Sequence, residues 1–173
     1  MQPSGRSGGS ARPGLARGVK EESAAVENHF TQVTVGKFIF RVKSGCLYTG
    51  EGLWLAWQTS DDTVRVGLSD YLQQSSGDAA FVELPAVGQT LRRGDDLARV
   101  ETVKVDLTLP APFAATVIAV NAQLAASPEL INQDPYGEGW LAELKPDAWP
   151  ALGLMDADAY LAVMTAQAEE ASR

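Results

Sequence analysis

The chain has 173 residues, which suits one domain of ordinary size together with a terminal tail. Its 14 basic residues face 22 acidic ones, for a formal net charge of −8, and an acidic protein is poorly suited to nucleic acid, whose phosphates are bound by clustered Lys and Arg. No apolar run approaches membrane-spanning length, and the single cysteine, Cys46, cannot form an internal disulfide, which fits a reducing compartment. The composition therefore predicts a cytoplasmic or organelle-matrix protein with neither nucleic acid nor membrane as a partner.

Residues 1–28 are rich in Gly, Ser, Ala and Arg and lack apolar periodicity, so we expect a disordered tail there. Arginine and serine without an acid before Glu21 are also typical of a transit peptide, but Pro3, Pro13 and several glycines would break the amphipathic helix that such a peptide needs. The folded domain is expected over residues 29–171.

The first half of the domain reads mainly as strands. Residues 30–43 are expected to form one strand, because Phe38, Phe40 and Val42 alternate with other residues as on a half-packed face. Further strands are expected over 53–58, 63–68 and 79–85, and a polar turn over 59–62. A short helix is expected from Ser69, with Gly77 ending it.

A lysine set between two valines stands at the centre of the next segment, residues 94–112. The residues around Lys104 are mostly β-formers, and Gly94 and Pro110 would end such a run. We therefore expect two strands that meet near Lys104, although no Asn-Gly or Asp-Gly marks the turn between them. On residue type alone, the ordinary interpretation is a solvated lysine on a strand.

The second half continues with short elements and ends in a helix. A strand is expected over 117–121, short helical turns over 121–130 and another strand over 140–144. A helix is expected from Asp156, with a core-packing face. That face would consist of Ala159, Tyr160, Val163, Met164 and Gln167.

Two motifs, in this order, resemble the signatures of one known family. Gly94-Asp95-Asp96, then Val-Glu-Thr-Val-Lys at 100–104, Pro112 and Val-Ile-Ala-Val-Asn at 117–121 resemble the lipoyl-attachment region of the glycine cleavage system H protein. The run from Ser127 to Trp140, which contains Asp-Pro-Tyr-Gly-Glu-Gly-Trp, is similar to that family's second signature, which other lipoyl domains lack. The resemblance covers roughly residues 47 to 165.

The resemblance implies a mainly β fold. The expected architecture is the lipoyl-domain barrel-sandwich hybrid, in which two small antiparallel sheets are accompanied by short helices and a C-terminal helix. It also implies a monomeric, non-catalytic carrier subunit of a multienzyme system, with no catalytic residue and no metal ligand of its own.

The site residues implied by the resemblance are Lys104, as the point of lipoate attachment, and Glu101, as a residue that lipoylating enzymes read. Only lysine combines a primary amine with a long flexible stem, and acylation removes its charge. The arm would carry an aminomethyl group and reducing equivalents. Its expected partners are a pyridoxal-phosphate glycine decarboxylase, an aminomethyltransferase, dihydrolipoyl dehydrogenase and a lipoate ligase or lipoyl transferase.

Three places depart from the family pattern. The usual His-Glu-Trp triplet falls where this chain reads Glu51-Gly52-Leu53-Trp54, a small-Gly pair has become Ala114-Ala115, and an acidic position after the lysine is Thr108. These departures leave two alternatives open: a divergent H-like lipoate-binding carrier of another route, such as sulfur oxidation, and a relay that passes lipoate to other acceptors. A biotin carrier is disfavoured, because Val103 and Val105 stand where such carriers have methionines.

Overall fold

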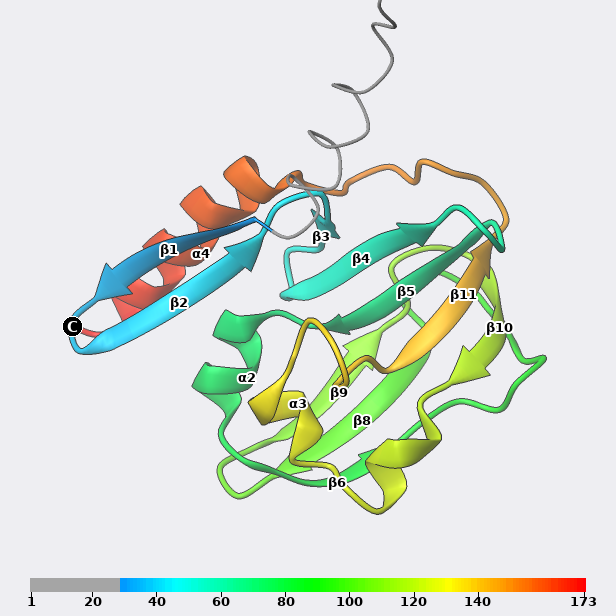
Figure 1. Cartoon of the computed structure of the whole chain (residues 1–173), viewed down its shortest axis with the longest axis horizontal. Helices are drawn as coiled ribbons and strands as arrows, with labels where there is room; N and C mark the ends of the chain where they lie inside the picture. Colours follow the sequence, from blue (N-terminus) through cyan, green and yellow to red (C-terminus); the bar gives the residue numbers. More distant parts are fainter. Residues whose placement is uncertain (1–28) are drawn as a thin grey trace, which may run out of the picture.

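The computed structural model describes residues 29–173, and the tail expected over residues 1–28 lies outside the described residues. Within the described part, antiparallel strands form three sheets, accompanied by short helices and a longer helix near the end of the chain (Figure 1). Over residues 29–173 the sheets do not close into a barrel. The expected mainly β architecture is confirmed, with one sheet more than the two predicted.

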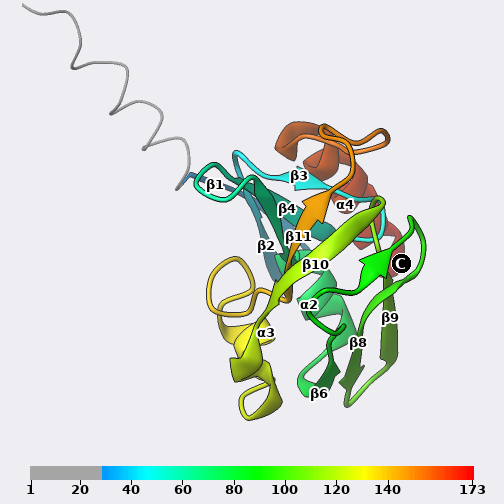
Figure 2. The same cartoon turned by 90° about the vertical axis from the view of Figure 1, so that its right-hand side faces the viewer.

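The two larger sheets form the main body. The six-stranded sheet has the order β3 (Leu47–Tyr48), β4 (Leu53–Gln58), β5 (Thr63–Leu68), β11 (Ala142–Pro146), β10 (Ala115–Val120) and β7 (Thr90–Leu91). The three-stranded sheet has the order β6 (Ala79–Glu83), β8 (Asp96–Thr102) and β9 (Asp106–Pro110). Figure 2 shows β6, β8 and β9 together below the larger sheet.

The two larger sheets share one hydrophobic core. Leu53 and Val66 of the six-stranded sheet and Val100 and Leu109 of the three-stranded sheet belong to one cluster of buried side chains. Each such side chain contributes about 1.5–3 kcal/mol through removal of apolar surface from water. This shared core fixes the position of β8 and β9, the strands on either side of Lys104.

The two longer helices begin at side-chain caps that were expected. The Ser69 hydroxyl accepts a hydrogen bond from Leu72 N at 3.3 Å at the start of α2 (Asp70–Ser76), and Asp156 Oδ1 accepts one from Ala159 N at 2.8 Å at the start of α4 (Ala157–Ala171). The short element η1 (Ala122–Ala125) supplies the helical turn predicted over 121–130, and a second one, α3 (Leu130–Gln133), begins where that range ends. Among residues 29–173, no helix has the length and apolar character to cross a bilayer.

The face that α4 buries differs from the expected one. Tyr160, Met164 and Ala168 are buried, whereas Ala159, Val163 and Gln167 are exposed. The buried residues are four apart and form a narrow stripe, because α4 packs on a two-stranded hairpin rather than on a wide sheet. The expected stripe was therefore right for two of its residues and wrong for three.

The single strand expected over residues 30–43 is wrong. The chain forms a hairpin of β1 (Phe30–Val35) and β2 (Phe38–Lys43), in which Val35 pairs with Phe38 across a two-residue turn. Gly36 occupies the left-handed region at φ 60°, which glycine adopts without steric cost. The chain can therefore reverse its direction at this residue, and the two halves of the expected strand pair with each other. This hairpin is the third sheet.

Candidate functional site

Lys104 lies at the tip of the β8–β9 hairpin. Glu101 pairs with Asp106 in the antiparallel register, and the four residues from Thr102 to Val105 make the turn. The Lys104 side chain is exposed, as is Val103, which keeps 80% of its surface accessible. The strands expected to meet near Lys104 do so within one sheet, and the amine is presented to solvent.

Thr102 supplies the turn chemistry that the sequence did not make visible. Its Oγ1 accepts hydrogen bonds from Val105 N at 2.9 Å and from Lys104 N at 3.2 Å, and lies 2.6 Å from the carbonyl oxygen of Ser76, to which it can donate. Threonine hydroxyls stabilise turns by such local bonds. Thr102 thus replaces the Asn-Gly signal, and a threonine two residues before the lysine is the clue that could have indicated it.

The hairpin tip rests on the C-terminal end of α2. Lys104 Nζ donates to the carbonyl oxygen of Ser75 at 3.2 Å, and Val103 N donates to that of Asp78 at 3.1 Å. The carbonyl end of a helix carries partial negative charge and favours an ammonium group. Gly77 sits between these contacts, and a Cβ built there would lie 3.4 Å from Lys104 Cβ. Helix α2 therefore fixes the place of the lysine.

Glu101 lies on the exposed face of the same sheet, three residues before the lysine. Its Oε1 is 3.4 Å from Arg99 Nη2, which is also 3.4 Å from Asp106 Oδ2. These three side chains keep between 41% and 60% of their surface, so solvent screens the ion pairs and they contribute little to stability. The carboxylate of Glu101 therefore remains accessible to solvent.

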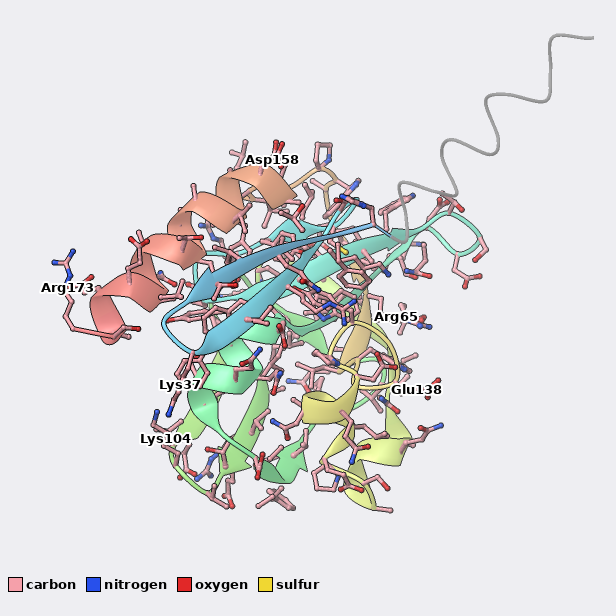
Figure 3. The ribbon with its side chains drawn as sticks, turned by 60° about the vertical axis from the view of Figure 1, so that its left-hand side comes forward. Lys37, Arg65, Lys104, Glu138, Asp158 and Arg173 are labelled. Atoms are coloured by element: carbon pink, nitrogen blue, oxygen red, sulfur yellow. The ribbon has the colours of Figure 1, made fainter. Side chains whose placement is uncertain are left out.

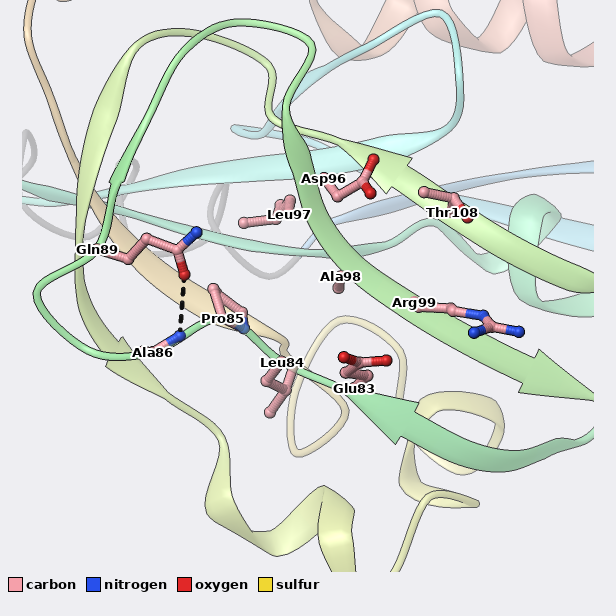
Figure 4. A pocket seen from close by; sticks show the side chains of 10 residues that line it. All are labelled: Glu83, Leu84, Pro85, Ala86, Gln89, Asp96, Leu97, Ala98, Arg99 and Thr108. Atoms are coloured by element: carbon pink, nitrogen blue, oxygen red, sulfur yellow. Dashed lines mark hydrogen bonds between the residues drawn. The ribbon is translucent and has the colours of Figure 1, made fainter.

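A hollow of about 350 Å³ lies further along this sheet (Figure 4). Glu83 and Arg99 line it together with Thr108, the residue at the family's acidic position. Lys104 is not among its lining residues. The hollow therefore does not border the amine of Lys104.

A smaller cleft of about 190 Å³ does include Lys104. It lies between the β1–β2 hairpin, α2 and the last turn of α4, and Phe38, Phe40 and Tyr71 form its aromatic part. Sequence reasoning missed this cleft, because the hairpin was taken for one strand and because residues 38 and 171 are distant in the chain.

The second signature reaches the neighbourhood of the lysine hairpin through Asn132, whose Nδ2 donates to the carbonyl oxygen of Gly77 at 3.0 Å. Tyr136 donates to the carbonyl oxygen of Arg41 at 2.9 Å, and Arg65 lies over the Trp140 ring, 4.5 Å from its centroid. Asp134 Oδ2 accepts from Glu138 N at 2.9 Å and so stabilises the loop. The contact of Trp140 with Arg65 is a packing contact.

The positions that depart from the family pattern also have structural contacts. Gly52 is buried at φ 99°, where a Cβ would lie 3.1 Å from Leu72 Cβ and 3.4 Å from the Tyr160 hydroxyl. Trp54 is buried and donates through Nε1 to the carbonyl oxygen of Pro135 at 2.8 Å. Ala115 is buried at the start of β10.

Cys46 and the sole histidine are not part of a reactive centre. Cys46 is 5% exposed, and burial raises the pKa of its thiol from 9.0 to about 11, so it is a packed residue. His29 lies before β1, where its carbonyl oxygen accepts a hydrogen bond from Ser44 N. Among residues 29–173, no three His, Cys, Asp or Glu side chains are placed to hold a metal ion.

Comparison with known proteins agrees with this geometry. The family model described as "Glycine cleavage H-protein" matches residues 46–167. A glycine cleavage system H protein of Mycolicibacterium smegmatis is 51% identical over 122 residues, which cover 68% of this chain and 92% of the relative. One of Bacteroides thetaiotaomicron is 44% identical over 118 residues, with the same coverage.

A solved structure extends the similarity to the fold. The crystal structure of a glycine cleavage system H protein from Mycobacterium marinum superposes with a TM-score of 0.62 at 33% identity, covering 69% of this chain and 95% of that one. The matched residues include the Lys104 hairpin, α2 and most of α4, whereas the β1–β2 hairpin precedes them. By sequence and by structure, this chain belongs to the glycine cleavage H-protein family.

Proposed function

We propose that the protein is a lipoyl carrier of glycine cleavage and that lipoate is attached to Nζ of Lys104. The observation that carries this proposal is an exposed primary amine at the tip of a β-hairpin, inside the residues that match the family. The amine is held through one hydrogen bond to a backbone carbonyl, which an acylating enzyme can break at little cost. The exposure of Lys104 and its single side-chain hydrogen bond therefore leave room for an acyl group on Nζ.

The roles of the neighbouring residues follow from their positions. Glu101 offers a carboxylate on the exposed face of β8 that a lipoate ligase or lipoyl transferase can read. Thr102 and the end of α2 hold the turn, so the amine is presented in one place. We take residues 29–171, with the added hairpin and α4, as the lipoyl domain.

The chain itself acts as a monomeric, non-catalytic carrier in the cytoplasm. When bound, the lipoyl group supplies a cyclic disulfide that can accept an aminomethyl group and two electrons and be reoxidised by thiol–disulfide exchange. The protein presents this group in turn to a pyridoxal-phosphate glycine decarboxylase, an aminomethyltransferase and dihydrolipoyl dehydrogenase. Its net acidic surface favours partners with basic docking faces.

The first experiment is the intact mass of the protein from a lipoate-competent host. We expect one lipoyl increment on the unchanged chain and none on Lys104→Arg, because arginine keeps the charge but offers no acylable amine. Lys145→Arg, which changes an exposed lysine on β11, is the matched control and should keep the increment. An increment that persists in Lys104→Arg would refute attachment at this residue.

The second experiment tests the route. Lipoylated protein mixed with an active glycine decarboxylase should support glycine-dependent exchange of labelled carbon dioxide, and Lys104→Arg should not. Lipoylation without exchange would reject the glycine route and leave a carrier of another route, such as sulfur oxidation, or a lipoate relay.

A further inference from the structure

The second signature contacts the base of the lysine turn through the short helix α3. In the view of Figure 3, the labelled Glu138 of this signature lies well apart from Lys104. Helix α3, which belongs to the same signature, lies instead beside α2, the helix on whose end the lysine turn rests (Figure 1). Asn132 is the residue of α3 that bonds to the end of α2.

Residues 75–78, at the end of α2, hold the lysine turn through backbone carbonyl groups. Three of their carbonyl oxygens contact side-chain or backbone groups of residues 102–104, namely those of Ser75, Ser76 and Asp78. The fourth, that of Gly77, accepts a hydrogen bond from Asn132 Nδ2 at 3.0 Å. This short segment is therefore bonded to the lysine turn and to α3 at the same time.

Asn132 bonds to the backbone on either side of a glycine in an unusual conformation. Gly77 has φ 91° and ψ −174°, a region that residues with a Cβ rarely adopt. Asn132 donates to the carbonyl oxygen of Gly77, and its Oδ1 accepts from Ala79 N at 2.9 Å. Because a backbone carbonyl only accepts and a backbone N–H only donates, these two bonds fix the orientation of the amide. Asn132 thus stabilises the path of the chain from α2 into β6.

Asn132 is itself held by polar side chains of α2. Its Nδ2 also donates to Gln73 Oε1 at 3.0 Å, and Gln73 Nε2 donates to Asp70 Oδ1 at 2.8 Å. Gln73 and Asp70 are each only 8% exposed, so water competes little for these bonds. The position of the Asn132 amide is therefore determined by α2 as well as by α3.

We propose that Asn132 is a positioning residue for the acylation of Lys104. It acts through residues 75–78, which it holds in the arrangement that orders the lysine turn. This inference rests on the proposed function. An enzyme that binds the ordered turn finds fewer competent molecules when this arrangement is only partly populated, and its apparent affinity falls by the same fraction.

Two substitutions of Asn132 and one matched control test the role. Asn132→Ala removes three side-chain hydrogen bonds, whereas Asn132→Asp keeps the shape and the acceptor but removes the donor to the Gly77 carbonyl. Asn121→Ala is the control, because the Asn121 side chain also makes three hydrogen bonds. Two of those bonds go to the carbonyl oxygens of Glu138 and Trp140, and none goes to residues 75–79. Urea unfolding establishes that each variant is folded under the assay conditions.

The first measurement is the rate of lipoylation of the full-length proteins. A lipoate ligase is supplied with lipoyl adenylate, from which Nζ of Lys104 takes the acyl group; the new amide bond forms as AMP leaves and the ammonium group loses protons. We expect both Asn132 variants to raise the KM for the protein about tenfold with little change in kcat, and Asn121→Ala to change neither. A general loss of stability does not raise the KM while the proteins stay folded. Intact mass follows the reaction.

The second measurement is amide hydrogen exchange of the unlipoylated proteins. Val103 N donates to the carbonyl oxygen of Asp78 at 3.1 Å, so its exchange reports whether the turn is bonded to residues 75–78. We expect the Val103 amide to exchange about tenfold faster in both Asn132 variants, because this bond opens locally. In Asn121→Ala it should exchange at the unchanged rate.

An unchanged KM in the Asn132 variants would overturn the positioning role while leaving lipoylation intact, whatever the exchange rates. A rise in KM as large in Asn121→Ala would also overturn it, because the effect would then follow general destabilisation. Absence of any lipoyl increment on the unchanged protein would overturn the carrier function and the positioning role together. The failure of the inference alone is therefore distinguishable from the failure of the proposed function.

Discussion

A few side chains around the bend decide how the lysine is presented. Lys104 itself makes one hydrogen bond through its side chain, to the carbonyl oxygen of Ser75, whereas Thr102 bonds to several backbone groups of the turn and of α2. Residue type alone indicated an ordinary solvated lysine. Only the family motif identified Lys104 as a candidate site. The role of Thr102 could not be predicted, because it depends on the approach of α2, which is 26 residues away in sequence.

Thr102→Val tests this role at the scale of one residue. The substitution keeps the shape and removes the hydroxyl, so it should destabilise the protein by about 1 kcal/mol and slow lipoylation several-fold, because the turn no longer holds the amine in place. Thr108→Val changes an exposed threonine of β9 and should alter neither property. Urea unfolding and a time course of intact mass measure the two effects; equal rates in both variants would contradict the assignment.

At the scale of elements, the sequence correctly predicted the features that depend on a few neighbouring residues. The strands β4 and β5 and the capped starts of α2 and α4 agree with the expected positions, because alternation and capping residues act over a few neighbours. The β1–β2 turn was missed although Gly36 marks it, and β11 begins two residues later than expected. The buried face of α4 depends on its partner, which a single-sequence pattern does not reveal.

The cap of α4 gives a prediction at this scale. Asp156→Ala removes the acceptor of the hydrogen bond from Ala159 N and should lower the free energy of unfolding by about 1 kcal/mol. Asp158→Ala removes an acid from the same first turn without removing the cap, so it isolates the weaker interaction with the helix dipole. Urea unfolding of both variants measures the difference. A loss as large in Asp158→Ala would mean that charge, and not the cap, stabilises the start of the helix.

At the scale of the whole molecule, the fold could be predicted from two motifs and the site only in part. Membership of the family gives the two facing sheets, and the order of the motifs gives the position of the lysine hairpin. The cleft beside Lys104 could not be derived from them, because Phe38, Tyr71 and Ala171 belong to separate elements. Their proximity is a result of packing between β2, α2 and α4.

The buried hydroxyls and thiol make the stability of the whole molecule depend on alkaline pH. Burial raises the pKa of Tyr160 to about 12 and that of Cys46 to about 11, and also raises the pKa of Tyr48 and Tyr136. Between pH 9 and 11 the unfolded chain loses the Cys46 proton while the folded chain keeps it, so the free energy of unfolding falls as pH rises. Below pH 9 the thiol is protonated in both the folded and the unfolded chain, so its titration does not lower the free energy of unfolding there.

Cys46→Ala should therefore flatten the fall in stability above pH 9. The shift from 9.0 to about 11 corresponds to a loss of about 2–3 kcal/mol across this interval in the unchanged protein, with the tyrosines adding to it above pH 10. Urea unfolding at several pH values gives the slope of the free energy of unfolding against pH for both proteins. The cavity that alanine leaves lowers the free energy by the same amount at every pH, so it does not change this slope. Parallel curves for the two proteins would show that the thiol titrates alike in the folded and unfolded chains.

The cleft beside Lys104 is lined by residues far apart in the chain, so during synthesis it is completed later than the β8–β9 hairpin. The strands on either side of Lys104 are neighbours in sequence and can pair as soon as they leave the ribosome, whereas Phe38 must wait for Ala171 before its side of the cleft is complete. A nascent chain that has emerged only to the middle of α4 would thus already expose the Lys104 amine but lack the α4 side of the cleft beside it. The surface beside the Lys104 amine is therefore complete only after the last turn of α4 has packed against β2.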